Sequence, residues 1–151
     1  MMLLLACVLC LGVAGCTSRD EDDDNETYHT RDYIIGIGKW NTDRVKKADG
    51  NWTDFPFGEG KSFTIEFFDK KNDNGERIFK SWENINHTDP KQSADEYEGS
   101  YTVNGKTVIC TVDGKQHLRM FITSMENREL GATVTFYKQN VTFDAIMTRS
   151  W

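Results

Sequence analysis

The sequence predicts an all-β protein, an eight-stranded antiparallel up-and-down β-barrel that follows an N-terminal signal peptide and a disordered tether. Two observations over residues 33–151 predict the barrel domain. Short runs rich in Val, Ile, Thr, Phe and Tyr alternate with clusters of Gly, Asn and Asp, the pattern of strands joined by hairpins. The turn signals also recur every ten to thirteen residues or so, as in an antiparallel meander. No stretch shows a convincing helical period beyond a turn at 90–96.

Eight strands are expected, each ending near a turn signal. The clearest signals are Asn104-Gly105, where both residues are expected at positive φ, and Asp113-Gly114. A meander of short strands favours a closed barrel, because closure removes exposed edges that would otherwise aggregate. An immunoglobulin-like sandwich is the competing architecture, but its long crossovers fit tight hairpins poorly. The expected strands lie near residues 33–46, 60–69, 75–83, 96–103, 106–113, 117–124, 129–137 and 140–149.

Residues 1–15 have the character of a bacterial lipoprotein signal peptide. The segment is uncharged and too short for a membrane-spanning helix. It ends with small residues at Ala14-Gly15, so cleavage is expected before Cys16, whose thiol would accept the lipid. The alternative is an ordinary secretory signal that happens to precede a cysteine. No Lys or Arg precedes Leu3, which leaves open a start codon upstream of Met1.

Residues 16–32 are expected to form an acidic, flexible tether between the membrane and the domain. Six of the 24 acidic residues lie between Asp20 and Glu26, and without them and Arg19 the remaining chain has a net charge of −1. A nearly neutral domain gives no case for nucleic-acid binding, which requires a basic face. The acidic run after the cysteine resembles the export signal of lipoproteins of the Bacteroides group, which are carried to the outer face of the outer membrane. A solvated spacer without a sorting role is the alternative.

The sequence gives little support for an enzyme, and it indicates no cofactor, metal site or catalytic residues. His29, His87 and His117 are scattered over tether, loop and strand, with no spacing that would converge on a metal ion. Gly-x-Ser-x-Gly and phosphate-loop motifs are absent. Cys7 and Cys10 leave with the signal peptide and Cys16 is acylated, so no intrachain disulfide is expected. Cys110 alternates with Val108 and Val112 in an expected strand, which predicts an inert, buried thiol.

Several motifs make the domain resemble small bacterial lipocalin-like domains. Gly38-Lys39-Trp40 is similar to the Gly-x-Trp motif of lipocalins, and the stretch 99–108 resembles the Gly-x-Tyr, Asn-Gly hairpin of the bacterial domains. The resemblance implies that Arg149 stacks on Trp40 and closes one barrel end through a cation–π contact. A clear Thr-Asp-Tyr motif is missing. The resemblance implies a fold and a binding module, without an attached chemistry.

Aromatic residues are the candidates for a ligand lid or cavity. Trp52, Phe55, Phe57 and Trp82 lie in or beside the long first connection and the third expected strand, where they would cap the open mouth of a lipocalin-type barrel. Tyr101 and Phe136 are expected on the barrel wall. The alternative is that these rings fill a narrow eight-stranded interior.

The expected protein is therefore a cell-envelope lipoprotein that is anchored in the outer membrane through Cys16, and whose barrel binds a small apolar ligand. A filled barrel that acts as a protein–protein interaction module at the outer membrane or cell surface is the alternative.

Overall fold

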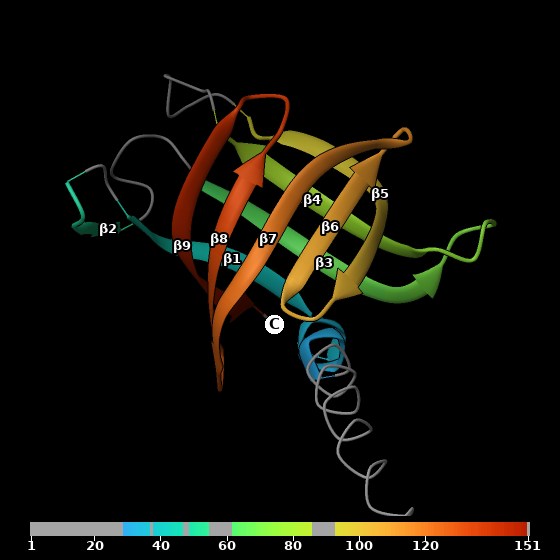
Figure 1. The fold of residues 1–151 in the computed structure, drawn as a ribbon, viewed down its shortest axis with the longest axis horizontal. Helices are drawn as coiled ribbons and strands as arrows, with labels where there is room; N and C mark the ends of the chain where they lie inside the picture. The colour runs from blue at the N-terminus through green and yellow to red at the C-terminus, as the bar shows by residue number, and fades with distance from the viewer. Residues whose placement is uncertain (1–28, 37, 47–48, 55–61, 86–92, 151) are drawn as a thin grey trace, which may run out of the picture.

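The computed structural model describes residues 29–36, 38–46, 49–54, 62–85 and 93–150 of the 151-residue chain, and shows a β-barrel with one short helix at its end (Figure 1). The helix occupies residues 29–36. The predicted signal peptide and Cys16 lie outside the described residues. The strands are β1 (Lys39–Lys46), β2 (Trp52–Asp54), β3 (Ser62–Lys71), β4 (Arg77–Asn84), β5 (Asp95–Asn104), β6 (Thr107–Val112), β7 (Lys115–Glu126), β8 (Glu129–Phe136) and β9 (Val141–Ser150).

Eight of these strands close into a barrel, which confirms the predicted fold. From β3 to β9 each strand pairs antiparallel with the next, β3 pairs with β1, and β1 pairs with β9 to complete the ring. The short strand β2 is additional, and the sequence did not predict it. It lies on the same edge of β1 as β3 but further along, because β3 pairs with Lys39 to Asn41 and β2 pairs with Arg44 to Lys46.

The Thr42 hydroxyl bridges the point at which β1 changes partner. It donates to the carbonyl oxygen of Phe63 at 2.5 Å and accepts from the Phe63 amide at 3.0 Å. Thr42 is buried, so water cannot satisfy the backbone groups of Phe63 here. The two hydrogen bonds to the Thr42 hydroxyl take the place of backbone hydrogen bonds of the ladder. The β1–β9 ladder shifts register directly afterwards, between Thr42 and Arg44.

The hairpin signals predicted the turn positions well. Asp113 and Gly114 both have positive φ, at 51° and 76°, as expected for a two-residue turn. The Asn104-Gly105 turn is displaced by one residue from the prediction: Asn104 pairs with Thr107, so Gly105 and Lys106 form the loop. Gly105, with a φ of 59°, then occupies the first central position, where a type II′ turn takes glycine.

Residues 29–36 correct the predicted tether and first strand, because they form a helix and β1 begins only at Lys39. Ile34 is fully buried, and the Tyr33 ring lies 5.6 Å from the Trp40 ring between centroids. The apolar run from Tyr33 to Ile35 is typical of the start of a strand. Contacts of Tyr33 and Ile34 with the end of the barrel stabilise the helix instead. Gly38 allows the turn into β1 with a φ of +88°.

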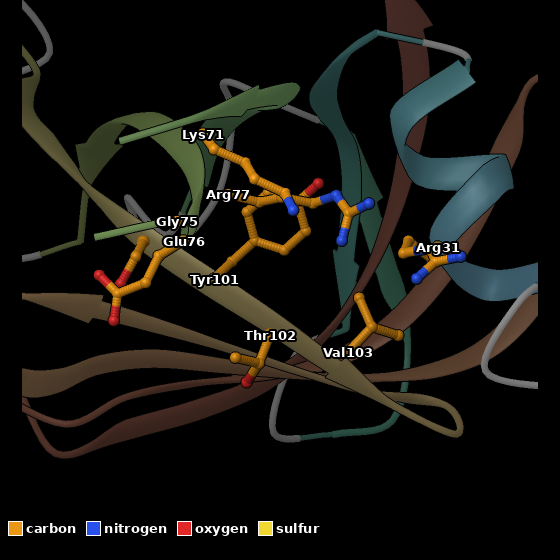
Figure 2. A pocket seen from close by; sticks show the side chains of 9 residues that line it. Arg31, Lys71, Gly75, Glu76, Arg77, Tyr101, Thr102 and Val103 are labelled. Atoms are coloured by element: carbon orange, nitrogen blue, oxygen red, sulfur yellow. The ribbon is translucent and has the colours of Figure 1, made fainter. Parts of the chain in front are cut away.

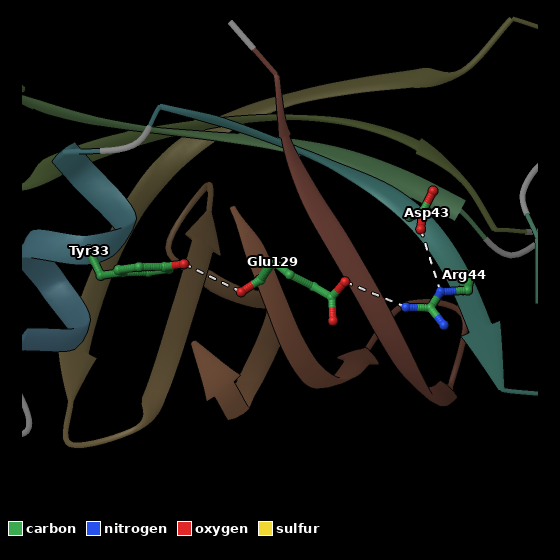
Figure 3. Close-up of polar contacts among 4 residues, drawn as sticks. All are labelled: Tyr33, Asp43, Arg44 and Glu129. Carbon is green, nitrogen blue, oxygen red and sulfur yellow. Dashed lines mark hydrogen bonds and ion pairs between the residues drawn. The ribbon is translucent and has the colours of Figure 1, made fainter. Parts of the chain in front are cut away.

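Polar contacts also hold the helix to the barrel. The Tyr33 hydroxyl donates to the carbonyl oxygen of Asn127 at 2.9 Å and lies 3.4 Å from that of Glu129. Figure 3 shows the Glu129 carboxylate in turn facing Arg44 of β1, with an N–O distance of 3.5 Å. Burial raises the pKa of Tyr33, so its hydroxyl keeps the proton that it donates. The helix end of the barrel is therefore joined to β1 and to the β7–β8 hairpin.

Alternating side chains from all eight barrel strands form the core of the described interior. Large rings dominate it: Phe63 lies 5.2 Å from Phe136 and Phe67 lies 4.9 Å from Tyr101, both edge to face. Gly99 on β5 faces the same interior, and its lack of a side chain is required there. A Cβ at this position would overlap the carbonyl oxygen of Thr111 and lie 3.0 Å from Phe79 Cε1.

Gly99→Ala is expected to lower the free energy of unfolding by about 1 to 3 kcal/mol, because the backbone of β6 must move to admit a methyl group. Denaturant unfolding measures the loss. Gly36→Ala is the matched control, since nothing lies within 4 Å of a Cβ there. Equal stability of the two variants would contradict the close packing at Gly99.

Candidate functional site

Ser81, Glu83, Tyr97 and His117 form a polar cluster inside the barrel, at the end opposite the helix. Glu83 and His117 are 1% and 7% exposed, and His117 Nε2 lies 2.6 Å from Glu83 Oε1. Their strands, β4 and β7, are separated in the sheet by β5 and β6. The contact therefore crosses the interior of the barrel.

Strand alternation places the β4 members of the cluster. Phe79, Ser81 and Glu83 are buried, while the residues between them are only partly buried. Ser81 pairs across the sheet with Tyr97 of β5, which places the two side chains beside each other.

A β-bulge places His117. Cys110 pairs with Leu118 and Thr111 with Gln116, so His117 is an extra residue on β7 with no Cα partner in this ladder. As a result His117 and Leu118 are both buried although they are consecutive. Thr111 on the other side of the bulge is the residue whose carbonyl oxygen lies against Gly99.

The two carboxylate oxygens of Glu83 have different environments. Oε1 accepts hydrogen bonds from Ser81 Oγ at 2.7 Å and from the Nε2–H of His117 at 2.6 Å. Oε2 is buried and has no hydrogen-bond partner among the described residues. A buried acceptor without a donor is costly, by about 1 to 3 kcal/mol, so Oε2 is a place where an incoming donor would be stabilised.

Aromatic rings surround the polar pair. The Tyr97 ring lies 4.2 Å from the His117 ring between centroids, and the Phe136 ring meets His117 edge to face at 6.5 Å. Phe136 also stacks on Phe143 at 6.0 Å. The site therefore combines a hydrogen-bonded carboxylate with an apolar aromatic wall, the usual composition of a small-molecule site.

Burial controls the protonation of two neighbouring groups. Burial raises the pKa of Tyr97, and the nearby charge of Glu83 raises it further. Burial also raises the pKa of the Cys110 thiol well above its ordinary value, with Glu83 adding to the effect. Cys110 is a free, fully buried cysteine whose thiol stays protonated, and a protonated thiol is a poor nucleophile.

The structure separates the residues predicted for a ligand lid. Phe136 belongs to the aromatic wall, and buried Tyr101 lies nearer the helix end of the barrel. Trp82 lies on the outer face, where Lys39 Nζ sits 4.0 Å from the centre of its ring, because Ser81 and Glu83 take the inward positions. Trp52 on β2 is 42% exposed. Phe55 and Phe57 lie outside the described residues.

The predicted barrel-end residues are adjacent in the structure. Trp40 and Arg149 are directly paired between β1 and β9, and Trp40 is fully buried. The positive charge of Arg149 also acts on Tyr33 of the helix, lowering the pKa that burial raises. Trp40, Arg149 and the helix thus lie together at one end of the barrel.

The sequence analysis did not identify the Ser81–Glu83–His117 cluster. One signal was available for Glu83: it lies four residues after Phe79 in a predicted strand, so strand alternation places the two side chains on the same face. His117 carried no such signal, because its inward direction depends on the bulge.

Comparison of the chain with protein-family models, with curated proteins and with solved structures finds no significant match. Within the described residues no helix combines the length and apolar character needed to cross a membrane. The same part of the chain has no group of three or more His, Cys, Asp or Glu side chains arranged to hold a metal ion.

A double-mutant cycle tests the Glu83–His117 contact. His117→Phe leaves the buried Glu83 carboxylate without its His117 donor and should cost about 3 to 5 kcal/mol of unfolding free energy. Adding Glu83→Met removes the stranded carboxylate, so the double variant should be more stable than His117→Phe alone. Denaturant unfolding measures both.

The exposed Lys80–Glu98 pair, with an N–O distance of 3.1 Å, is the matched control for this cycle. Its coupling energy should stay below about 1 kcal/mol, because water screens an exposed pair. Additive effects of the Glu83 and His117 substitutions would contradict a direct interaction across the barrel.

Proposed function

We propose that this protein is a cell-envelope lipoprotein that is anchored through Cys16, and whose barrel binds a small, mostly apolar molecule carrying a hydrogen-bond donor. The observation that carries the proposal is the buried Glu83 Oε2, an acceptor with no partner among the described residues. A ligand hydroxyl or amine that donates to Oε2 would satisfy it, while the rings of Tyr97 and Phe136 would contact the apolar part of the ligand.

The position of the cluster supports entry from the barrel end opposite the helix. His117 follows the β6–β7 turn closely, and Phe136 is the last residue of β8. The helix and its contacts with Trp40 occupy the other end. A ligand at Glu83 would thus approach from the end that the helix, among the described residues, does not occupy.

A second candidate is a filled barrel that docks onto an envelope protein. The ring contacts across the interior favour it, since Phe63 of β3 and Phe136 of β8 touch although β1 and β9 lie between their strands. The large exposed side chains Trp52, Phe121 and Tyr137 would then be candidates for the docking surface.

Native mass spectrometry of the protein extracted gently from the membranes of its host tests both parts of the proposal. A bound molecule should add mass that is lost on denaturation. A lipid on Cys16 should add mass that survives denaturation and maps to a mature N-terminus at that residue. A denatured mass without lipid would contradict the anchor, and a bare native mass with a co-purifying protein would favour the docking domain.

Glu83→Gln tests where the molecule binds. Ser81 and His117 both donate to Oε1, so the amide oxygen should take that position and the NH2 group should face the ligand donor. The NH2 group and the ligand donor would then face each other without an acceptor, which should weaken ligand binding about 10- to 100-fold. Native mass spectrometry would measure this as loss of the bound molecule. Glu96→Gln, an exposed carboxylate, is the control. Equal retention in the two variants would exclude Glu83 from the site.

A further inference from the structure

A second site lies at the helix end of the barrel, away from Glu83. A pocket of about 320 Å³ opens between the helix, the β3–β4 hairpin and β5. Figure 2 shows the Tyr101 ring in its centre, with the Lys71 and Arg77 side chains on one side and Arg31 of the helix facing them. Three cationic side chains from three different elements therefore converge on one cavity.

The charges of Arg77 and Lys71 are only partly neutralised by the described residues. Arg77 Nε lies 3.2 Å from Asp69 Oδ1, and water partly screens this pair because the Asp69 side chain is 72% exposed. Lys71 forms no ion pair with any described residue. The acidic lining residue Glu76 accepts a hydrogen bond from Asn72 Nδ2 at 3.0 Å, and Figure 2 shows its carboxylate on the far side of the Tyr101 ring from the guanidinium groups.

Tyr101 provides a fixed wall for the pocket. Its hydroxyl donates to the carbonyl oxygen of Phe68 at 3.2 Å, and its ring packs edge to face on Phe67. The pKa of Tyr101 is raised to about 12, chiefly by burial, and the positive charges of Arg77 and Arg31 oppose this rise. Both guanidinium groups thus act electrostatically at the same buried ring.

We propose that this pocket binds a phosphate group, carried either by a small phosphorylated molecule or by a lipid headgroup. Guanidinium groups present paired N–H donors that match phosphate oxygens, and an ammonium group adds a compact charge. The lipid source rests on the proposed anchor, because the helix is the described element nearest to Cys16 in the chain. The free phosphate source does not depend on the anchor.

Calorimetric titration of the membrane-extracted protein in neutral detergent with inorganic phosphate is the first test. We expect saturable binding that weakens about tenfold in Arg77→Gln and in Lys71→Gln, since each removes a charge-assisted contact. Arg119→Gln, an exposed base on β7, is the matched control and should bind as the wild type does. Glu83→Gln should also leave phosphate binding unchanged, which separates this pocket from the proposed ligand site.

Native mass spectrometry in micelles that contain equal phosphatidic acid and phosphatidylcholine distinguishes the two sources. Preferential retention of phosphatidic acid that is lost in Arg77→Gln and Lys71→Gln supports a lipid headgroup. Phosphate binding without such retention supports a small phosphorylated molecule. The absence of both, or equal weakening by Arg119→Gln, would overturn the phosphate site.

Discussion

The hydrogen bond from His117 Nε2 to Glu83 Oε1 is the contact on which the barrel interior depends. It joins two strands that are not neighbours in the sheet, and it gives a buried carboxylate a charge-assisted partner. The bulge at His117 is required to bring the imidazole inward, and Gly99 leaves room for the displaced Thr111 carbonyl. Two local features, the bulge and Gly99, thus serve one buried contact.

The two ends of the barrel have different chemistry as a consequence. At one end the helix packs Tyr33 against Trp40, and the hydroxyl of Tyr33 binds the β7–β8 hairpin. At the other end a carboxylate with one open oxygen lies among aromatic rings. The first end also holds the cationic pocket lined by Arg31, Lys71 and Arg77, whereas the second holds the buried acceptor Glu83 Oε2 among aromatic side chains.

Much of the fold could be predicted from the sequence because hairpin turns and strand alternation are local signals. Asp113-Gly114 and the alternation ending at Phe136 placed the second half of the barrel correctly. The helix at 29–36 escaped prediction because tertiary contacts of Ile34, and not a helical period, hold it. Strand β2 escaped for a similar reason, since it pairs with β1 where β3 does not.

The candidate site was less accessible to sequence reasoning. Aromatic residues in or beside the first connection and the third expected strand suggested a lid. In the structure, however, Trp82 points outward from β4, whereas Ser81 and Glu83 point inward. A charged residue at an inward position is uncommon, so alternation alone does not reveal Glu83 as buried. The bulge that buries His117 is a shift in the pairing of β6 with β7, which no local sequence pattern records.

The most direct measurement is a long-range ¹H–¹⁵N NMR spectrum of the His117 imidazole. We expect a protonated Nε2 whose hydrogen exchanges slowly with solvent, and whose signal moves when Glu83→Gln replaces the charged acceptor with a neutral one. An Nε2 proton that exchanges rapidly, or a signal that Glu83→Gln leaves in place, would contradict the buried contact across the barrel.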